Sequence, residues 1–242
     1  MKSLFDQNIL FYARWSLVTV LYIISSCTDR IPTEVAPINI PLSGPITDRN
    51  EEISGMDWYG DQLILLPENL NGYLFVIPKS ELDARIHNQD TSTIFPKKVK
   101  FLTPDYKKTI PGFDSFEAIA FRGYEVYITI EIRFPDSMAA VLARGHIDEN
   151  TMEVTIPEQN LIELAVPSFV DNMSYESIVI DQNTIYAFFE ANGDSLVKNP
   201  YALICSLPPT GKLKMVPISP LEYRIADATR LDSRKHFWII NY

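Results

Sequence analysis

Four stretches of this chain repeat one pattern, in which two polar residues, most of them acidic, stand fourteen positions apart around a central turn. The flanking positions are apolar with a partial period of two, which is typical of a β-hairpin. Because a hairpin folds back at its turn, the two polar residues of each copy should lie close together. The four copies are Ser54–Glu68, Glu117–Glu131, Glu176–Glu190 and Asp227–Asn241.

The spacing of the copies predicts one supersecondary unit per copy. They begin 63, 59 and 51 residues apart, the spacing expected of propeller blades. The pattern therefore predicts an all-β fold: a β-propeller, partial or small, with three four-stranded blades and a fourth hairpin. A helix is expected only at 80–86, with Ser80 as its N-cap. The further strands are expected at 73–77, 138–147, 153–156, 201–207 and 212–218.

The end of the sequence allows two interpretations of how the blades close into a propeller ring. A propeller needs about four to eight blades to close, and the sequence stops at Tyr242, at the far end of the fourth hairpin. Either residues 28–52 supply the strands missing from a fourth blade, or the sequence is a truncated piece of a longer propeller. We expect truncation, because the apolar run 237–240 would otherwise be a terminal strand that needs cover.

The first 26 residues have the pattern of a bacterial lipoprotein signal peptide. Lys2 and Arg14 precede a short apolar run, 15–24, that suits the apolar region of a signal peptide and is too short to span a bilayer. The run ends in Ile-Ser-Ser-Cys, which resembles a lipobox and implies that Cys27 is acylated after cleavage. The alternative is an ordinary secretory signal with an incidental cysteine. We expect residues 27–52 to form a tether, residues 53–242 to form the blades, and the protein to sit in the bacterial cell envelope, on the periplasmic side or at the cell surface.

The net charge limits the classes of partner that the chain can bind, and its second cysteine has a structural interpretation. The net charge is −10 and the isoelectric point is about 4.8, which argues against nucleic acid as a partner because phosphate binding needs clustered basic residues. The one cysteine besides Cys27 is Cys205, inside an apolar run, and we expect it to be a small buried residue.

The repeat also resembles a known family. The copies EAIAFRGYEVYITIE, ESIVIDQNTIYAFFE and DATRLDSRKHFWIIN are similar to the repeats of bacterial six-bladed propellers of the phytase-like, SdiA-regulated group. The resemblance covers residues 53–242. This chain differs in having Ala118 and Ser177 where the family often has glycine, and Ser54 where it has an acid.

The resemblance implies that the repeated polar residues crowd one mouth of a central channel. Carboxylates held together repel one another, so some of them must bind a cation or hold a proton. Carboxylate and amide oxygens are hard ligands that favour Ca²⁺ over zinc. An alternative role is structural, with the same acids accepting hydrogen bonds from backbone N–H groups of neighbouring blades. The candidate metal ligands are Glu68, Glu117, Glu131, Glu176, Glu190, Asp227 and Asn241.

Two functions remain open from the sequence. The first is a membrane-anchored extracytoplasmic propeller module that binds a small ligand or a protein partner at the channel mouth, with Ca²⁺ as the candidate cofactor. Arg230, within the fourth copy, is the candidate contact for an anionic ligand. The alternative is a metal-assisted hydrolase of phosphate esters, as in phytase-like proteins, or of other esters. The first is favoured, since the sequence has no nucleophile-elbow motif and no histidine spacing typical of zinc.

Overall fold

The structure is a computed structural model that describes residues 36–88, 90–208 and 212–241. The predicted signal peptide and the lipidation site Cys27 lie outside these residues. The chain divides into two compact units, Met1–Asn39 and Ile40–Tyr242, and the second unit contains every strand described below. Among the described residues, no helix has the length and apolar character needed to cross a membrane.

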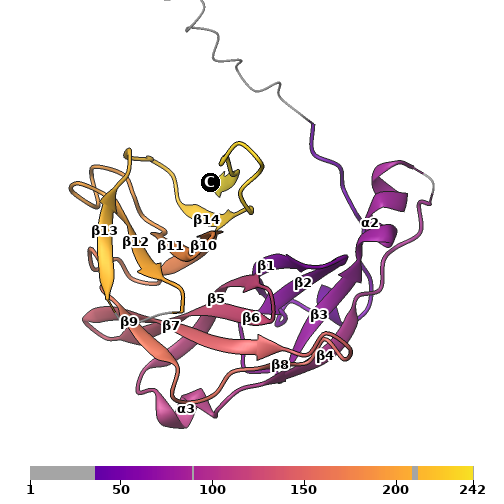
Figure 1. Cartoon of the computed structure of the whole chain (residues 1–242), viewed down its shortest axis with the longest axis horizontal. Coiled ribbons are helices and arrows are strands. Elements are labelled where there is room, and N and C mark those ends of the chain that lie inside the picture. The colour runs from indigo at the N-terminus through magenta and orange to yellow at the C-terminus, as the bar shows by residue number, and fades with distance from the viewer. Residues whose placement is uncertain (1–35, 89, 209–211, 242) are drawn as a thin grey trace, which may run out of the picture. The chain divides into compact units, whose positions relative to one another are not determined.

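The first blade is an antiparallel meander of four strands (Figure 1). Its first two strands turn at Gly60 and Asp61, and Gly60 has the positive φ of 57° that a tight turn requires. The basic run at 97–100 lies in the fourth strand. The strands are β1 (Ile53–Tyr59), β2 (Gln62–Pro67), β3 (Tyr73–Pro78) and β4 (Lys97–Leu102).

The second blade departs from the predicted four-stranded unit. Two short strands, β8 and β9, pair with successive parts of the same edge of β7. The other edge of β8 pairs in parallel with β4, so the first and second blades form one nine-stranded sheet. The strands are β5 (Phe113–Arg122), β6 (Glu125–Phe134), β7 (Ser137–Ile147), β8 (Val154–Thr155) and β9 (Leu161–Leu164).

The third blade matches the prediction, and the fourth copy forms a wider hairpin than expected. The third blade is a four-stranded meander, whereas the two strands of the fourth copy are joined by a long loop, 229–238. Within this loop the chain turns at Ser233 and Arg234, as expected, with Asp232 Oδ1 accepting the backbone N–H of Arg234 at 2.7 Å. The strands are β10 (Tyr175–Asp181), β11 (Thr184–Phe189), β12 (Tyr201–Ser206), β13 (Leu213–Pro217), β14 (Ile225–Ala228) and β15 (Ile239–Asn241).

The hairpins stack face to face through alternating side chains of their first strands. In β5, Ile119 and Phe121 pack toward the first blade, while Ala118 and Ala120 pack toward the third. The third blade in turn covers the fourth hairpin through a smaller apolar cluster. The first strands β1, β5, β10 and β14 therefore lie in sequence around one centre, which is the arrangement of a β-propeller (Figure 1).

Three short helices complete the described part: η1 (Pro45–Thr47), α2 (Lys79–Ile86) and α3 (Tyr106–Thr109). The helix expected at 80–86 is α2, but the prediction of its N-cap is wrong, because Pro78 occupies the N-cap and no side chain caps the helix. Helix α3 was not predicted.

The described part of the predicted tether packs on the first blade. Ile40, Leu42 and Ile46 contact its outer apolar cluster, and Leu42 forms a parallel bridge with Ile94. Residues 40–46 therefore lie with the first blade, and the structure pairs none of residues 40–52 with the fourth hairpin.

Candidate functional site

In each repeat a β-bulge of the inner strand lies at or next to the first polar end. In the third copy, Tyr175 pairs with Phe189 and Ser177 with Phe188, which leaves Glu176 in the bulge. Glu190 at the other end continues the ladder, donating its backbone N–H to the Ser174 carbonyl at 2.8 Å. The ends thus converge as the repeat predicts, but through a bulge rather than as a directly opposed pair. Bulges re-aim side chains and are common next to functional sites.

Five of the eight repeat ends line a cavity of about 460 Å³ at one end of the inner strands, whereas Glu131, Glu190 and Asn241 do not. Four carboxyl side chains and one guanidinium line it, together with a few apolar residues of β1 and β15. Asn241, a candidate ligand, is exposed at the end of β15, and Ile240 rather than Asn241 lines the cavity. The charged lining residues are Glu68, Glu117, Glu176, Arg224 and Asp227.

Glu117 is the most enclosed carboxyl of the cavity lining. It is 6% exposed, and its carboxyl accepts a hydrogen bond from the Ser115 hydroxyl. Burial raises the pKa of Glu117 to about 8, and the nearby carboxyls of Glu131, Glu68 and Glu190 add repulsion. The hydrogen bond from Ser115 acts in the opposite direction and lowers the pKa. The side chain therefore holds its proton at neutral pH.

Glu176 and Glu190 lie close together, and Arg224 binds Glu190. Burial raises the pKa of Glu176 to about 9, assisted by the charges of Glu117 and Glu190. Glu190 is fully buried and forms an ion pair with the guanidinium of Arg224, which limits the rise that burial causes in its pKa. Arg224 comes from the start of the fourth hairpin, so this contact links the third and fourth copies. Sequence reasoning missed Arg224, since nothing in the repeat marks it.

The pKa values of three further acids, Glu68, Glu131 and Asp227, are also raised. Burial raises the pKa of Glu68 to about 7, and the nearby carboxyl of Glu52 adds to the rise. Burial also raises the pKa of Glu131 to about 7, and there the nearby carboxyl is that of Asp114. The pKa of Asp227 rises to about 6, again through burial, and its carboxyl repels that of Asp57. These acids are therefore partly protonated near neutral pH.

The acids do not form a ready-made metal site. Their oxygens are the hard donors that Ca²⁺ prefers, but Ca²⁺ takes six to eight oxygen ligands around one point. Within the described ranges, no group of three or more His, Cys, Asp or Glu residues is arranged to hold a metal ion. As placed, the side chains instead offer spread-out hydrogen-bond donors and acceptors.

A second cavity, of about 310 Å³, lies at the other end of the inner strands. Residues 53–56 of β1 line the acidic cavity and residues 56 and 57 line the second one. The other inner strands follow the same order: β5 passes from residue 117 to 119–122, and β10 from 176 to 178 and 180. The two cavities are therefore the two ends of one channel between the inner strands.

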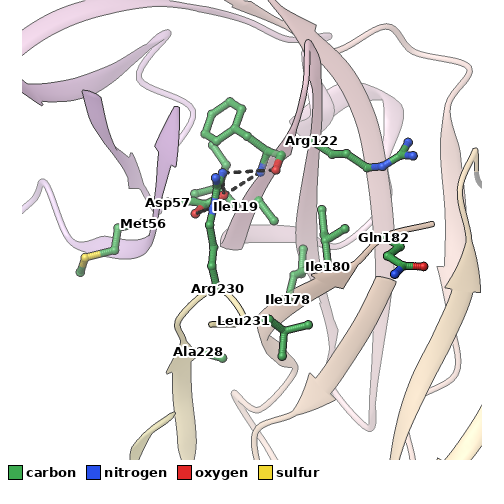
Figure 2. Close-up of a pocket in the computed structure, with 12 residues that line it drawn as sticks. Met56, Asp57, Ile119, Arg122, Ile178, Ile180, Gln182, Ala228, Arg230 and Leu231 are labelled. Carbon is green, nitrogen blue, oxygen red and sulfur yellow. Dashed lines mark hydrogen bonds and ion pairs between the residues drawn. The ribbon is translucent and has the colours of Figure 1, made fainter. Parts of the chain in front are cut away.

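Arg230, the predicted anion contact, lies in this second cavity and not in the acidic one. Its guanidinium binds the carboxylate of Asp57 through two hydrogen bonds, from Nε to Oδ1 at 2.6 Å and from Nη2 to Oδ2 at 2.7 Å (Figure 2). Nη2 also donates to the carbonyls of Trp58 and, at 3.2 Å, Phe121. Much of its hydrogen-bonding capacity is thus used within the protein.

Comparisons with known protein families and with curated protein sequences found no match. Among solved structures, the extracellular domain of a protein described as a one-component system from B. thetaiotaomicron is 15% identical, with a TM-score of 0.39, over 82% of this chain and 21% of that chain. An α-L-arabinanase mutant from Cellvibrio cellulosa is 12% identical, with a TM-score of 0.44, over 76% and 62%. The Nup133 β-propeller domain of Vanderwaltozyma polyspora is 12% identical, with a TM-score of 0.39, over 80% and 54%. The chain thus corresponds to 21% of the length of the first of these structures and to less than two thirds of the other two.

Proposed function

We propose that the protein is a β-propeller binding module of the bacterial cell envelope, anchored through an acylated Cys27, whose acidic cavity binds a positively charged ligand. The observation that carries the proposal is the cavity of about 460 Å³ lined by the carboxyls of Glu68, Glu117, Glu176 and Asp227. Strongly raised pKa values in a cavity are characteristic of functional sites.

A cation fits the energetics of this lining better than an anion does. Four carboxyls face the cavity and Arg224 supplies its one guanidinium, whose charge is already engaged with Glu190. A bound cation would let the carboxyls of Glu117 and Glu176 release their protons and would relieve their mutual repulsion. An anion would make the ionisation of these carboxyls still less favourable and would be repelled by those that are ionised.

Two kinds of cation share this chemistry. A protonated amine needs hydrogen-bond acceptors distributed around it, and the separated carboxyls supply them without having to move together. Ca²⁺ would require several of the carboxylates to move together and to lose their protons first. The organic ammonium is therefore the ligand that we favour, and Ca²⁺ is the second arm of the experiment.

The test is isothermal titration calorimetry of the chain with 1,4-diaminobutane and, separately, with CaCl₂, at pH 6 and pH 8.5. We expect heat of binding and proton release with the diamine, and tighter binding at pH 8.5, where fewer protons must be displaced. Replacement of Glu117 and Glu176 together by glutamine should remove binding. Glu158→Gln, an exposed acid outside the cavity, is the matched control.

The outcomes separate the alternatives. If Ca²⁺ binds, the diamine does not, and the double variant loses Ca²⁺ binding, the protein would be a metal-dependent binding module instead. Binding that survives in the double variant, or no binding of either cation, would overturn the acidic cavity as the binding site. Turnover of p-nitrophenyl phosphate that requires CaCl₂ and is lost in the double variant would replace the binding module by the hydrolase alternative.

A further inference from the structure

We propose that the second cavity is a separate binding site for a ligand with an apolar body and a hydrogen-bond-accepting head, such as a carboxylate or amide carbonyl. This site lies at the opposite end of the channel from the acidic cavity. Its existence does not depend on what the acidic cavity binds, because the two cavities share only Met56 among their lining residues.

Eight of the twelve residues that line the second cavity are apolar. Ile119 of β5 and Ile178 and Ile180 of β10 form one side, and Ala228 and Leu231 of the fourth hairpin form the other (Figure 2). Of its polar lining residues, Arg122 and Gln182 direct their side chains away from Arg230 (Figure 2). Apolar pockets of about 300 Å³ and above with a few convergent polar groups are the usual form of small-molecule sites.

The polar group at the end of this apolar space is a donor. Arg230 is 49% exposed at its side chain, and its Nε and Nη2 are bonded to Asp57 and to two backbone carbonyls. Within the described ranges, no residue accepts a hydrogen bond from its Nη1. A guanidinium nitrogen donates and never accepts, so the complementary ligand atom is an oxygen acceptor.

The same contacts fix the donor in place. The oxygens of Asp57 accept the backbone N–H groups of Trp58 and Phe121, each at 2.7 Å, as well as the guanidinium. Because Asp57 is satisfied on both oxygens and is only 8% exposed, it holds Arg230 without presenting a free carboxylate to the ligand. A positioned donor loses little conformational entropy on binding, which favours affinity.

The experiment measures binding of three six-carbon probes to the chain by calorimetry: hexanoate, hexanamide and hexylamine. Hexanoate and hexanamide present acceptor oxygens and should bind with a dissociation constant on the order of 1 mM, as expected for ligands of this size. Hexylamine presents only a charged donor and should bind at least tenfold more weakly at this site.

Filling the cavity provides the structural control. Ile180→Trp should weaken hexanoate binding at least tenfold, whereas Leu213→Trp, at a partly buried position on β13 outside the cavity, should not. Leu231→Trp, in the loop of the fourth hairpin, is a second filling variant in case Ile180→Trp lowers the melting temperature. Three results would overturn the proposal. The first is that neither hexanoate nor hexanamide binds at 20 mM, and the second is that hexylamine binds equally well and Ile180→Trp weakens its binding too. The third is that hexanoate binding is unchanged in both filling variants although they are folded.

Discussion

Arg230 and Asp57 form a two-bonded ion pair, 2.6 Å and 2.7 Å between donor and acceptor atoms, although they lie 173 residues apart in the sequence. Asp57 belongs to β1 and Arg230 to the fourth hairpin, and the second carboxylate oxygen also accepts the N–H of Phe121 on β5. One carboxylate thus connects the first, second and fourth copies of the repeat. The contact fixes the fourth hairpin against the first blade.

Removal of this ion pair should loosen the fourth hairpin. Arg230→Gln leaves the carboxylate of Asp57 nearly buried with two backbone donors, and we expect a loss of about 1–3 kcal/mol in the free energy of unfolding, less than for a fully buried pair because Arg230 is half exposed. Urea unfolding measures the loss, and hydrogen exchange should locate it in β14 and β15. Arg234→Gln, an exposed arginine of the same hairpin, is the control and should change stability by no more than about 0.5 kcal/mol. Equal effects of the two variants would contradict the structural role of Arg230.

Stability should fall as the pH rises from about 5 to 9. The folded state raises the pKa of Glu117 to about 8 and of Glu176 to about 9, whereas the unfolded chain has ordinary carboxyl values near 4.5. Between these values the folded state binds more protons than the unfolded state, so stability is fully present below about pH 4.5 and is lost as the pH rises through the folded values. The measurement is the melting temperature as a function of pH in low salt.

The same titration has a matched variant. Glu117→Gln with Glu176→Gln keeps a neutral side chain at both positions at all pH values. We expect this variant to show a flatter pH profile and to exceed the parent in stability at pH 9 by at least about 1 kcal/mol. A parent profile that rises from pH 5 to 9 would show that these carboxyls are ionised in the folded protein.

A methyl group on Gly55 should separate the first two blades. A Cβ at this position of β1 would lie 3.0 Å from the backbone of Glu117, Ala118 and Ile119 in β5, where neither strand can yield easily. Gly55→Ala should therefore cost about 1–3 kcal/mol of unfolding free energy. Gly193→Ala is the control, because the nearest atoms lie at an ordinary 3.4 Å. Chemical denaturation compares the two, and a neutral Gly55→Ala would place β1 farther from β5 than the structure does.

The lipid anchor is tested by changing the predicted acylation site. Cys27→Ser should prevent acylation and shift the protein from the membrane fraction to the soluble fraction, since stable attachment through lipid requires the acyl chains. Cell fractionation and intact mass measure the two effects. Parent protein without a lipid mass increase, together with an unchanged distribution of the variant, would favour the secretory signal with an incidental cysteine.

The local pattern of the sequence was sufficient to predict the hairpins and their order. Period-two apolar positions on both sides of a turn specify a hairpin, because side chains of a strand alternate between its faces. The spacing of the copies then predicted the blades, and the third blade follows the prediction closely. The convergence of Glu117 and Glu176 with Glu131 and Glu190 also follows from the repeat, since a hairpin must bring its ends together.

The union of the first two blades could not be predicted in this way. It depends on parallel pairing of Phe101 with Val154 and of Leu102 with Thr155, between segments that share no local pattern. The position of Asn241 also differs from that of the acids with which it was grouped. In its copy the bulge falls at Ala226, one residue earlier than in the third copy, so that Asp227 pairs with Ile240 and Ile240 lines the cavity.

The sequence by itself determined the repeat, the all-β architecture and the acids that meet at one end of the channel, because these depend on side-chain alternation and turns within about fifteen residues. Only the tertiary structure decided which charges meet. Arg224 reaches Glu190, Arg230 reaches Asp57, and the proton affinities of Glu117 and Glu176 follow from burial between blades. These ion pairs and proton affinities depend on distances between segments far apart in the chain and on the exclusion of water. A local sequence pattern encodes neither.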